Sequence, residues 1–279
     1  MKFIKPKLED LRHYFKVSIP LIVGQSIAVM DEQLFRVFGS MLSVGAIASF
    51  RYARRVAILP VGVMAQAVGV ASFPTMSHLF VKEKFDELKE LIRQQIAILY
   101  FLNLAIVLIL ITNNAEIISL VYERGEFNNN DVLRVSSIMS IVAFGILPWS
   151  LNQIVTRAFY VQTNYWYPVL VGTSSTILAT LIILNIESKS EISYAIIIIA
   201  SLFLYSLILL TTLKIDGEKI LNKDLINDLI FSSIIYFVTL GLLQFLPIGD
   251  LGKIFYILIS VTIIALSFIV SVRVITVSY

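Results

Sequence analysis

Residues 192–213 read ISYAIIIIASLFLYSLILLTTL, a run that contains no charged side chain. A helix needs about 20 mostly apolar residues to cross the hydrocarbon core of a bilayer, and this run is long enough. Residues 96–111, IAILYFLNLAIVLILI, form a second run of the same kind. Neither run alternates polar and apolar residues as a strand of a membrane barrel does. The sequence therefore predicts an all-α protein that spans a membrane.

The composition of the whole chain supports this interpretation. Of the 279 residues, 58% are hydrophobic and 15% are charged, and the mean hydropathy is +0.87. A soluble domain is about 45–50% apolar and about 25% charged, so this chain has too few charges to cover a globule in water. We expect a polytopic membrane protein, and we assign the net charge of +3 to basic cytoplasmic loops. No nucleic-acid partner is expected.

Apolar runs predict about eight transmembrane helices. They lie near residues 17–38, 44–76, 95–112, 133–156, 168–186, 192–213, 228–247 and 253–273. The second run is too long for a straight span and contains Pro60, so we expect a kink or an interfacial leg there. Segment 81–93 is expected to form a separate amphipathic surface helix that needs no partner. Segment 122–131 is expected to be a turn-rich outer loop.

The distribution of basic residues between the loops predicts the orientation. Lysine and arginine are concentrated in the terminal segments and in the even-numbered loops, and few lie in the odd-numbered loops. Cytoplasmic loops of membrane proteins carry this excess. Both termini are therefore expected in the cytoplasm, which an even number of spans permits.

Residue types that support enzyme chemistry are scarce. The chain has no cysteine and two histidines, His13 and His78, which are far apart in sequence. It contains no HExxH motif, no glycine-rich phosphate loop and no GxSxG motif. We expect no catalytic residue, no metal site and no resident cofactor. The chain is not expected to be an enzyme.

Charged residues inside the first predicted span form one candidate site. They are Asp31, Glu32 and Arg36, and Glu32 is one helical turn from Arg36, so these two can pair. Intramembrane charges are costly, which makes each a functional hypothesis. Two interpretations stay open: a neutralised cluster that orients the helix, or a cation or substrate site. A coupling cation, if one is used, would bind at Asp31 and Glu32.

A second candidate site opens the second predicted span, FRYARRVAILPVG, residues 50–62. Arg51, Arg54 and Arg55 recur at helical spacing on one face, and no acidic residue lies between Glu32 and Glu83 to neutralise them. One interpretation is a site for a diphosphate, because the planar guanidinium matches phosphate oxygens. The alternative is that the arginines snorkel to the outer headgroups.

Several segments of the chain resemble one family. Residues 39–77, GSMLSVGAIASFRYARRVAILPVGVMAQAVGVASFPTMS, resemble the second half of the MurJ/MviN lipid II flippases, which are members of the multidrug/oligosaccharidyl-lipid/polysaccharide exporter superfamily. YERGEFNNND at 122–131 and RAFYVQTNYWYP at 157–168 resemble further signatures of that family. The resemblance covers essentially the whole chain.

The resemblance implies a fold and a function. It implies a cytoplasmic N-terminal segment (1–16), a six-helix transporter lobe (17–213) and two additional helices (214–279) that form a groove for a lipid tail. The implied function is translocation of a polyprenyl-diphosphate-linked saccharide across the bacterial inner membrane by alternating access. The implied partners are that saccharide, membrane lipid and an N-terminal lobe encoded separately or missing from this chain.

The resemblance also assigns roles to residues. Arg55 matches the arginine of the family that is implicated in holding the diphosphate, with Arg51, Arg54 and Arg36 as further substrate-binding candidates. Relatives carry an acidic residue before the arginine that matches Arg36, but here this position is Phe35.

Three alternatives to this function remain. One is another exporter of the superfamily, acting on O-antigen-type lipid-linked saccharides or on drugs. The others are a membrane-embedded enzyme that acts on polyprenyl phosphates and a non-catalytic membrane subunit.

Overall fold

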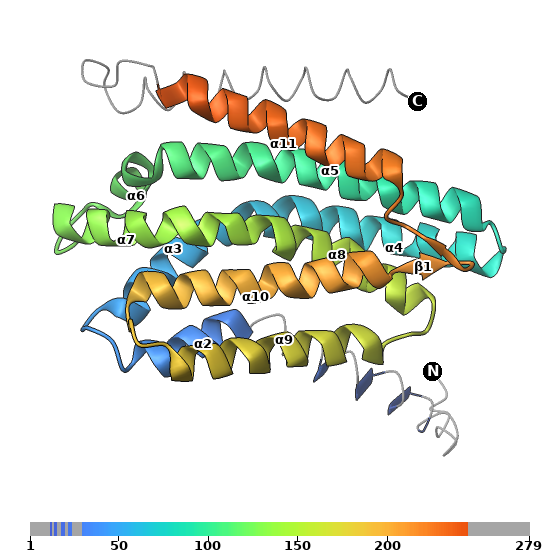
Figure 1. Cartoon of the computed structure of the whole chain (residues 1–279), viewed down its shortest axis with the longest axis horizontal. Helices are drawn as coiled ribbons and strands as arrows, with labels where there is room; N and C mark the ends of the chain where they lie inside the picture. Colours follow the sequence, from blue (N-terminus) through green and yellow to red (C-terminus); the bar gives the residue numbers. More distant parts are fainter. Residues whose placement is uncertain (1–11, 13, 16–17, 20–21, 24–29, 245–279) are drawn as a thin grey trace, which may run out of the picture.

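The computed structural model describes residues 12, 14–15, 18–19, 22–23 and 30–244, and shows an elongated bundle of helices that run roughly parallel or antiparallel to one another (Figure 1). The elements in chain order are α2 (Met30–Gly39), α3 (Ala46–Pro60), the π-helix η1 (Val61–Ala65), α4 (Gln66–Val81), α5 (Phe85–Thr112), α6 (Asn114–Tyr122), α7 (Asn129–Val142), the 3-10 helix η2 (Ala143–Gly145), α8 (Ile146–Val161), α9 (Trp166–Asn185), α10 (Glu191–Thr212), β1 (Lys214–Ile215), β2 (Glu218–Lys219) and α11 (Lys223–Gln244).

The described residues confirm a multi-helix membrane architecture. Five continuous helices among them are long and apolar enough to cross a bilayer: Ala46–Val81, Phe85–Thr112, Asn129–Val161, Trp166–Asn185 and Glu191–Thr212. They coincide with the second to sixth predicted spans. The first predicted span, 17–38, is described mainly from residue 30, and the seventh, 228–247, is described to residue 244 within α11. The eighth, 253–273, lies outside the described residues.

The long second span is irregular directly after Pro60, and the kink or interfacial leg expected there stays a prediction. Helices α3 and α4 join into one continuous helix through η1, a π-helical turn that starts directly after Pro60. Proline has no backbone N–H and its ring crowds the carbonyl one turn earlier, so the regular α-helical ladder cannot continue unchanged. A π-helical turn absorbs this mismatch and rotates the faces of α3 and α4 relative to each other.

The span Asn129–Val161 begins at a side-chain cap and contains one irregular turn. Asn128 caps α7, because its side chain accepts hydrogen bonds from the backbone N–H groups of Asn130 and Asp131, and the Asp131 carboxylate accepts one from Asn128 in return. Residues 123–128, between α6 and α7, are non-helical, in agreement with the turn-rich loop expected at 122–131. The 3-10 turn η2 then joins α7 to α8.

The prediction of a separate surface helix at 81–93 is wrong. The segment from Phe85 onward forms the first turns of α5, which continues without a break to Thr112. Leu88 and Ile92 are fully buried in these turns, and Lys89 is 5% exposed. The amphipathic pattern correctly indicates a helix, and its apolar face packs against other parts of this chain.

The partner of these turns is a short hairpin. Strands β1 and β2 pair antiparallel, with Asp216 and Gly217 at positive φ in the turn between them. Arg93 of α5 donates hydrogen bonds to the backbone carbonyls of Ile220 and Lys219 at 3.0 and 3.2 Å. The hairpin leads into α11, which packs along α5 (Figure 1).

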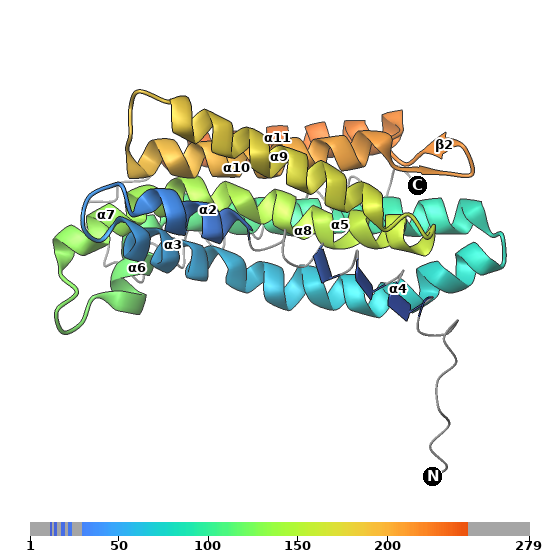
Figure 2. The ribbon, with the colours of Figure 1, turned by 90° about the horizontal axis from the view of Figure 1, so that it is seen from below.

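Helix α8 occupies the centre of the bundle. It contacts α4, α5 and α10, and Figure 2 shows it between the layer of α9, α10 and α11 and the long α3–α4 helix. Most of its residues are buried, which fits its position. The candidate site forms where α3 packs against both α2 and α8.

Candidate functional site

The three arginines of α3 lie in two different environments. Arg51 and Arg55 are exposed, whereas Arg54 is 8% exposed. Residues four apart share a helix face and adjacent residues are about 100° apart, so Arg51 and Arg55 form one open row while Arg54 points into the bundle. The sequence placed all three on one face. The structure separates Arg54 from the other two.

Glu32 of α2 neutralises part of this cluster. Its carboxylate lies 3.3 Å from Nη1 of Arg54 and 3.7 Å from Nε of Arg51. The expectation that these arginines have no acidic partner is therefore wrong for Arg51 and Arg54. The acidic partner comes from the neighbouring helix, which no local spacing could reveal. In the described part of the chain, the ion pairs of Glu32 go to α3 and not to Arg36 on its own helix.

The ring of Trp149 is a further contact of the Arg54 side chain. The guanidinium carbon of Arg54 lies 5.3 Å from the centre of the Trp149 ring, within the range of a cation–π contact. Trp149 belongs to the buried face of α8, so Arg54 joins α2, α3 and α8. Sequence reasoning missed Trp149 completely, because it lies far along the chain in a run with no other signal.

Of the two remaining charged candidates on α2, Arg36 and Asp31, the structure describes the side chain of Arg36 only. Arg36 is exposed in the last turn of α2. The side chain of Asp31 lies outside the described part of the chain, so its predicted role in cation coupling stays a prediction. Phe35, beside Arg36, is buried and stacks on Phe50 of α3 with ring centres 3.9 Å apart. This position is filled by aromatic packing between α2 and α3.

Arg55 lies beside an aromatic cluster at the end of α6. Tyr52, Tyr122 and Phe127 contact one another, with ring centres 4.8 to 5.8 Å apart. Burial raises the pKa of the Tyr122 hydroxyl, and the nearby positive charge of Arg55 acts in the opposite direction. The open row of arginines therefore borders half-buried aromatic rings that come from α3, α6 and the following loop.

A further arginine lies between α8 and α4. Nη1 of Arg157 donates to the side-chain oxygen of Gln153 at 2.9 Å and also to the Gln153 backbone carbonyl. The guanidinium fits because residue 69 on α4 is glycine, where a Cβ atom would come within 2.5 Å of Nη1. The side chain of Arg157 thus turns back along its helix toward Gln153, and it is half-buried.

The described residues contain no group of three or more His, Asp or Glu side chains that could hold a metal ion. Two guanidinium groups already contact the Glu32 carboxylate, and their positive charge opposes the binding of a cation there. What the open row can do chemically is bind an anion. Two planar guanidinium groups one helical turn apart can donate hydrogen bonds to several oxygens of one anion.

Comparison with known proteins gives consistent results. Residues 2–269 match the family model described as lipid II flippase MurJ. Among curated relatives named probable lipid II flippase MurJ, one from Treponema pallidum is 24% identical over 185 residues, which is 65% of this chain and 35% of that protein. One from Helicobacter pylori is 29% identical over 157 residues, which is 55% of this chain and 33% of that protein.

The fold agrees with a solved structure. The lipid II flippase MurJ in an inward closed conformation superimposes with a TM-score of 0.77 at 19% identity. The superposition covers 98% of this chain and 56% of the solved one. The matched part of this chain spans about a third of the length of the two curated relatives. Because the family model matches nearly the entire sequence, the chain belongs to the lipid II flippase MurJ family.

Proposed function

We propose that the chain is one lobe of a flippase that moves a polyprenyl-diphosphate-linked saccharide, lipid II, across the cytoplasmic membrane of a bacterium. The relatives are named for lipid II, and this substrate is carried over from them. The process moves a substrate between leaflets and breaks no covalent bond. It uses alternating access, in which the lobe works against a complementary lobe that corresponds to the rest of the longer relatives.

The observation that carries this proposal is the open row of Arg51 and Arg55. Both side chains are exposed on a helix that is otherwise long and apolar enough to span the membrane. A charge on such a helix is expensive unless it meets water or an anion. Two planar forks spaced one turn apart suit the several oxygens of a diphosphate. The complementary lobe would close the other side of this binding surface.

Arg55 is the stronger of the two candidates. Glu32 lies within 3.7 Å of Arg51 and offsets part of its charge. No acidic side chain among the described residues forms an ion pair with Arg55. Arg55 therefore keeps its full charge for a ligand, and the neighbouring rings of Tyr52 and Tyr122 limit where its guanidinium can go.

Substitution of Arg55 tests the proposal in the assembled two-lobe protein. Arg55→Ala should abolish flipping while protein level and membrane insertion stay unchanged, because the charge that grips the diphosphate is lost. Arg55→Lys should retain part of the activity, because it keeps the charge and loses the bidentate fork. The measurement is a flipping assay with lipid-linked saccharide in vesicles.

Lys189→Gln is the matched control for Arg55→Ala. It removes another exposed positive charge, which lies in the loop between α9 and α10 and far from α3 in sequence. Its flipping rate should equal that of the unmodified protein. Full activity of Arg55→Ala would refute the assignment, and full activity of Arg55→Lys would favour arginines that merely reach the headgroups.

A coupling cation is a separate proposal. The carboxylate of Glu32 contacts two arginines, so we place the cation at Asp31, with Glu32 as part of the substrate-binding surface. Asp31→Asn should then remove any dependence of flipping on an ion gradient, whereas Glu32→Gln should lower flipping at all gradients.

A further inference from the structure

Arg134 joins three elements at one end of the bundle. Its Nε donates to both carboxylate oxygens of Glu191, the first residue of α10, at 3.1 and 3.2 Å, and Nη2 also reaches this carboxylate. Nη1 donates to the backbone carbonyl of Val44 at 2.8 Å, and Nη2 donates to the hydroxyl of Ser43 at 2.7 Å. One guanidinium on α7 therefore holds α10 and the loop between α2 and α3.

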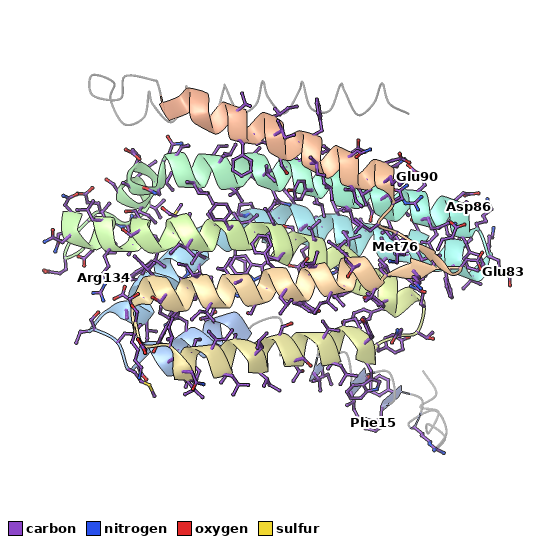
Figure 3. All side chains as sticks on the ribbon, viewed as in Figure 1. Phe15, Met76, Glu83, Asp86, Glu90 and Arg134 are labelled. Carbon is purple, nitrogen blue, oxygen red and sulfur yellow. The ribbon has the colours of Figure 1, made fainter. Side chains whose placement is uncertain are left out.

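This contact set, Arg134 with Glu191, Ser43 and Val44, is called the α7 clamp below. Figure 3 places Arg134 at the end of the bundle opposite Glu83, Asp86 and Glu90. The hydroxyl of Ser43 also donates to Glu191 at 2.9 Å, so the loop contacts both members of the ion pair. The side chain of Glu191 is 14% exposed, and a charge-assisted contact that is partly shielded from water is stronger than one on an open surface.

The first half of the loop is also fixed by Leu42, which packs against the hydrophobic core, and by backbone hydrogen bonds to the end of α2, but the second half is open to solvent. Val44 is 96% exposed, and Met41 and Ser43 are exposed as well. A pocket of 570 Å³ is lined by Met41, Leu42 and Ser43 of the loop together with Arg134 and Glu191. Ser43 adjoins this open space and Val44 is exposed, so among the described residues the hydrogen bonds of the α7 clamp are what tie this part of the loop to α7 and α10.

Gly45 shows that the loop and Arg134 fit each other closely. Its φ is +91°, a conformation that residues with a side chain rarely adopt. A Cβ atom at this position would also lie 2.8 Å from Nη1 of Arg134. The backbone thus approaches the guanidinium at the point where α3 begins.

The loop, together with the stacking of Phe35 on Phe50, determines how α2 and α3 lie relative to each other. Glu32 is on α2, and its two partners Arg51 and Arg54 are on α3. The loop is the only covalent link between these two helices, and it is short. We therefore expect a shift of the loop to change the distance between the Glu32 carboxylate and the two guanidinium groups.

We infer that Arg134 is a positioning residue for the candidate site: the α7 clamp fixes the loop and thereby holds Glu32 against Arg51 and Arg54. The effect of Arg134 on flipping rests on the proposed function. The statement that the α7 clamp fixes the loop does not depend on that function. The planar fork is essential, since a lysine at 134 could pair with Glu191 but could not reach Ser43 and Val44 at the same time.

The test uses the absence of native cysteine in the chain. Ala46, the first residue of α3, is 1% exposed, so Ala46→Cys creates one shielded thiol directly after the loop. Its modification rate by a small maleimide, measured in the full protein in membranes, reports release of the loop. Arg134→Lys should raise this rate about tenfold, since each lost hydrogen bond to a charged group is a substantial fraction of the free energy that keeps the loop closed.

A matched pair of variants at Ser43 separates positioning from general damage. Ser43→Ala removes two hydrogen bonds at an exposed position, the one from Arg134 and the one to Glu191, and should also raise the labelling rate of the thiol introduced by Ala46→Cys. Ser43→Thr keeps a hydroxyl and should restore the original rate. Lys189→Gln removes the other cation that lines the same pocket, and it should leave the rate within about twofold of the original.

Flipping assays on the same variants complete the test. Faster labelling together with slower flipping in Arg134→Lys and Ser43→Ala, and recovery of both in Ser43→Thr, would support the inference. Unchanged labelling in Arg134→Lys and Ser43→Ala would overturn it, and so would faster labelling with normal flipping. If Arg55→Ala flips normally, the proposed function fails, while the labelling result still decides whether the α7 clamp holds the loop.

Discussion

Arg54 and Arg55 are adjacent in the sequence, and their guanidinium groups lie in different surroundings. Arg54 is buried against Trp149 and bonded to Glu32, whereas Arg55 is exposed beside Tyr122. A buried charge that has its partner removed is costly, while an exposed charge contributes little to folding. The two neighbours should therefore serve different purposes, one in folding and one in binding.

Glutamine substitutions at both positions should separate these purposes. Arg54→Gln should lower the free energy of unfolding by about 3 kcal/mol. It removes the ion pair with Glu32 and the cation–π contact with Trp149. Arg55→Gln should leave stability within about 0.5 kcal/mol of the original and should still abolish flipping. Thermal unfolding in detergent and the flipping assay measure the two effects. Equal loss of stability in both variants would contradict the difference in burial.

At the scale of elements, the link between α5 and α11 depends on a buried lysine. Nζ of Lys89 lies 2.8 Å from a carboxylate oxygen of Asp86 and 2.5 Å from one of Glu218, which belongs to β2. Arg93, one turn later on α5, bonds the backbone at the end of the hairpin. Further along, the Tyr100 hydroxyl of α5 and the Ser233 hydroxyl of α11 are 2.8 Å apart. The hairpin is thus a fixed connection and not a loose linker.

Removing the lysine should release the hairpin. In Lys89→Met the side chain keeps its approximate size and loses both ion pairs, so trypsin should cut after Lys214 or Lys219 about tenfold faster. Lys84→Met is the control, because Lys84 pairs with Glu87 at an exposed site at 2.6 Å and does not contact the hairpin. Equal cleavage of the two variants in limited proteolysis would show that Lys89 does not hold the hairpin.

The elements also show what the sequence could and could not predict. Spans two to six were predictable because apolar runs of sufficient length have one stable solution in a bilayer. The irregular turn after Pro60 was predictable from the chemistry of proline. The fate of segment 81–93 was not predictable, since an amphipathic helix can pack equally against lipid or against a hairpin that lies more than a hundred residues away.

The candidate site was predictable in its residues and not in its pairing. Intramembrane charge singled out Glu32 and the arginines of α3. Which of them meet depends on how α2, α3 and α8 pack, and spacing along one helix cannot show this. For that reason the sequence paired Glu32 with Arg36, whereas the structure pairs it with Arg51 and Arg54.

At the scale of the whole molecule, the orientation in the membrane decides which half of the site faces which compartment. Basic residues are concentrated at one end of the bundle, around the turn between α4 and α5 and the hairpin: Lys82, Lys84, Lys89, Arg93, Lys214 and Lys219. The loops at the opposite end, marked by Arg134 in Figure 3, carry fewer, Arg124 and Lys189, while the arginines of α2 and α3 lie inside the predicted spans. The excess of positive charge predicts that the first end is cytoplasmic.

Single cysteines test this orientation, since the chain has none of its own. Glu83→Cys and Asn164→Cys lie at the end expected inside, and Glu126→Cys and Ser188→Cys lie at the end expected outside; all four positions are exposed. In intact cells a membrane-impermeant maleimide should label only the latter two, and permeabilised cells should give equal labelling of all four. The reverse pattern would place Arg51 and Arg55, which lie near the start of α3 at the end marked by Arg134, in the cytoplasmic half of the membrane. The arginines would then lie in the half of the membrane from which the diphosphate is taken up, and would meet it before translocation.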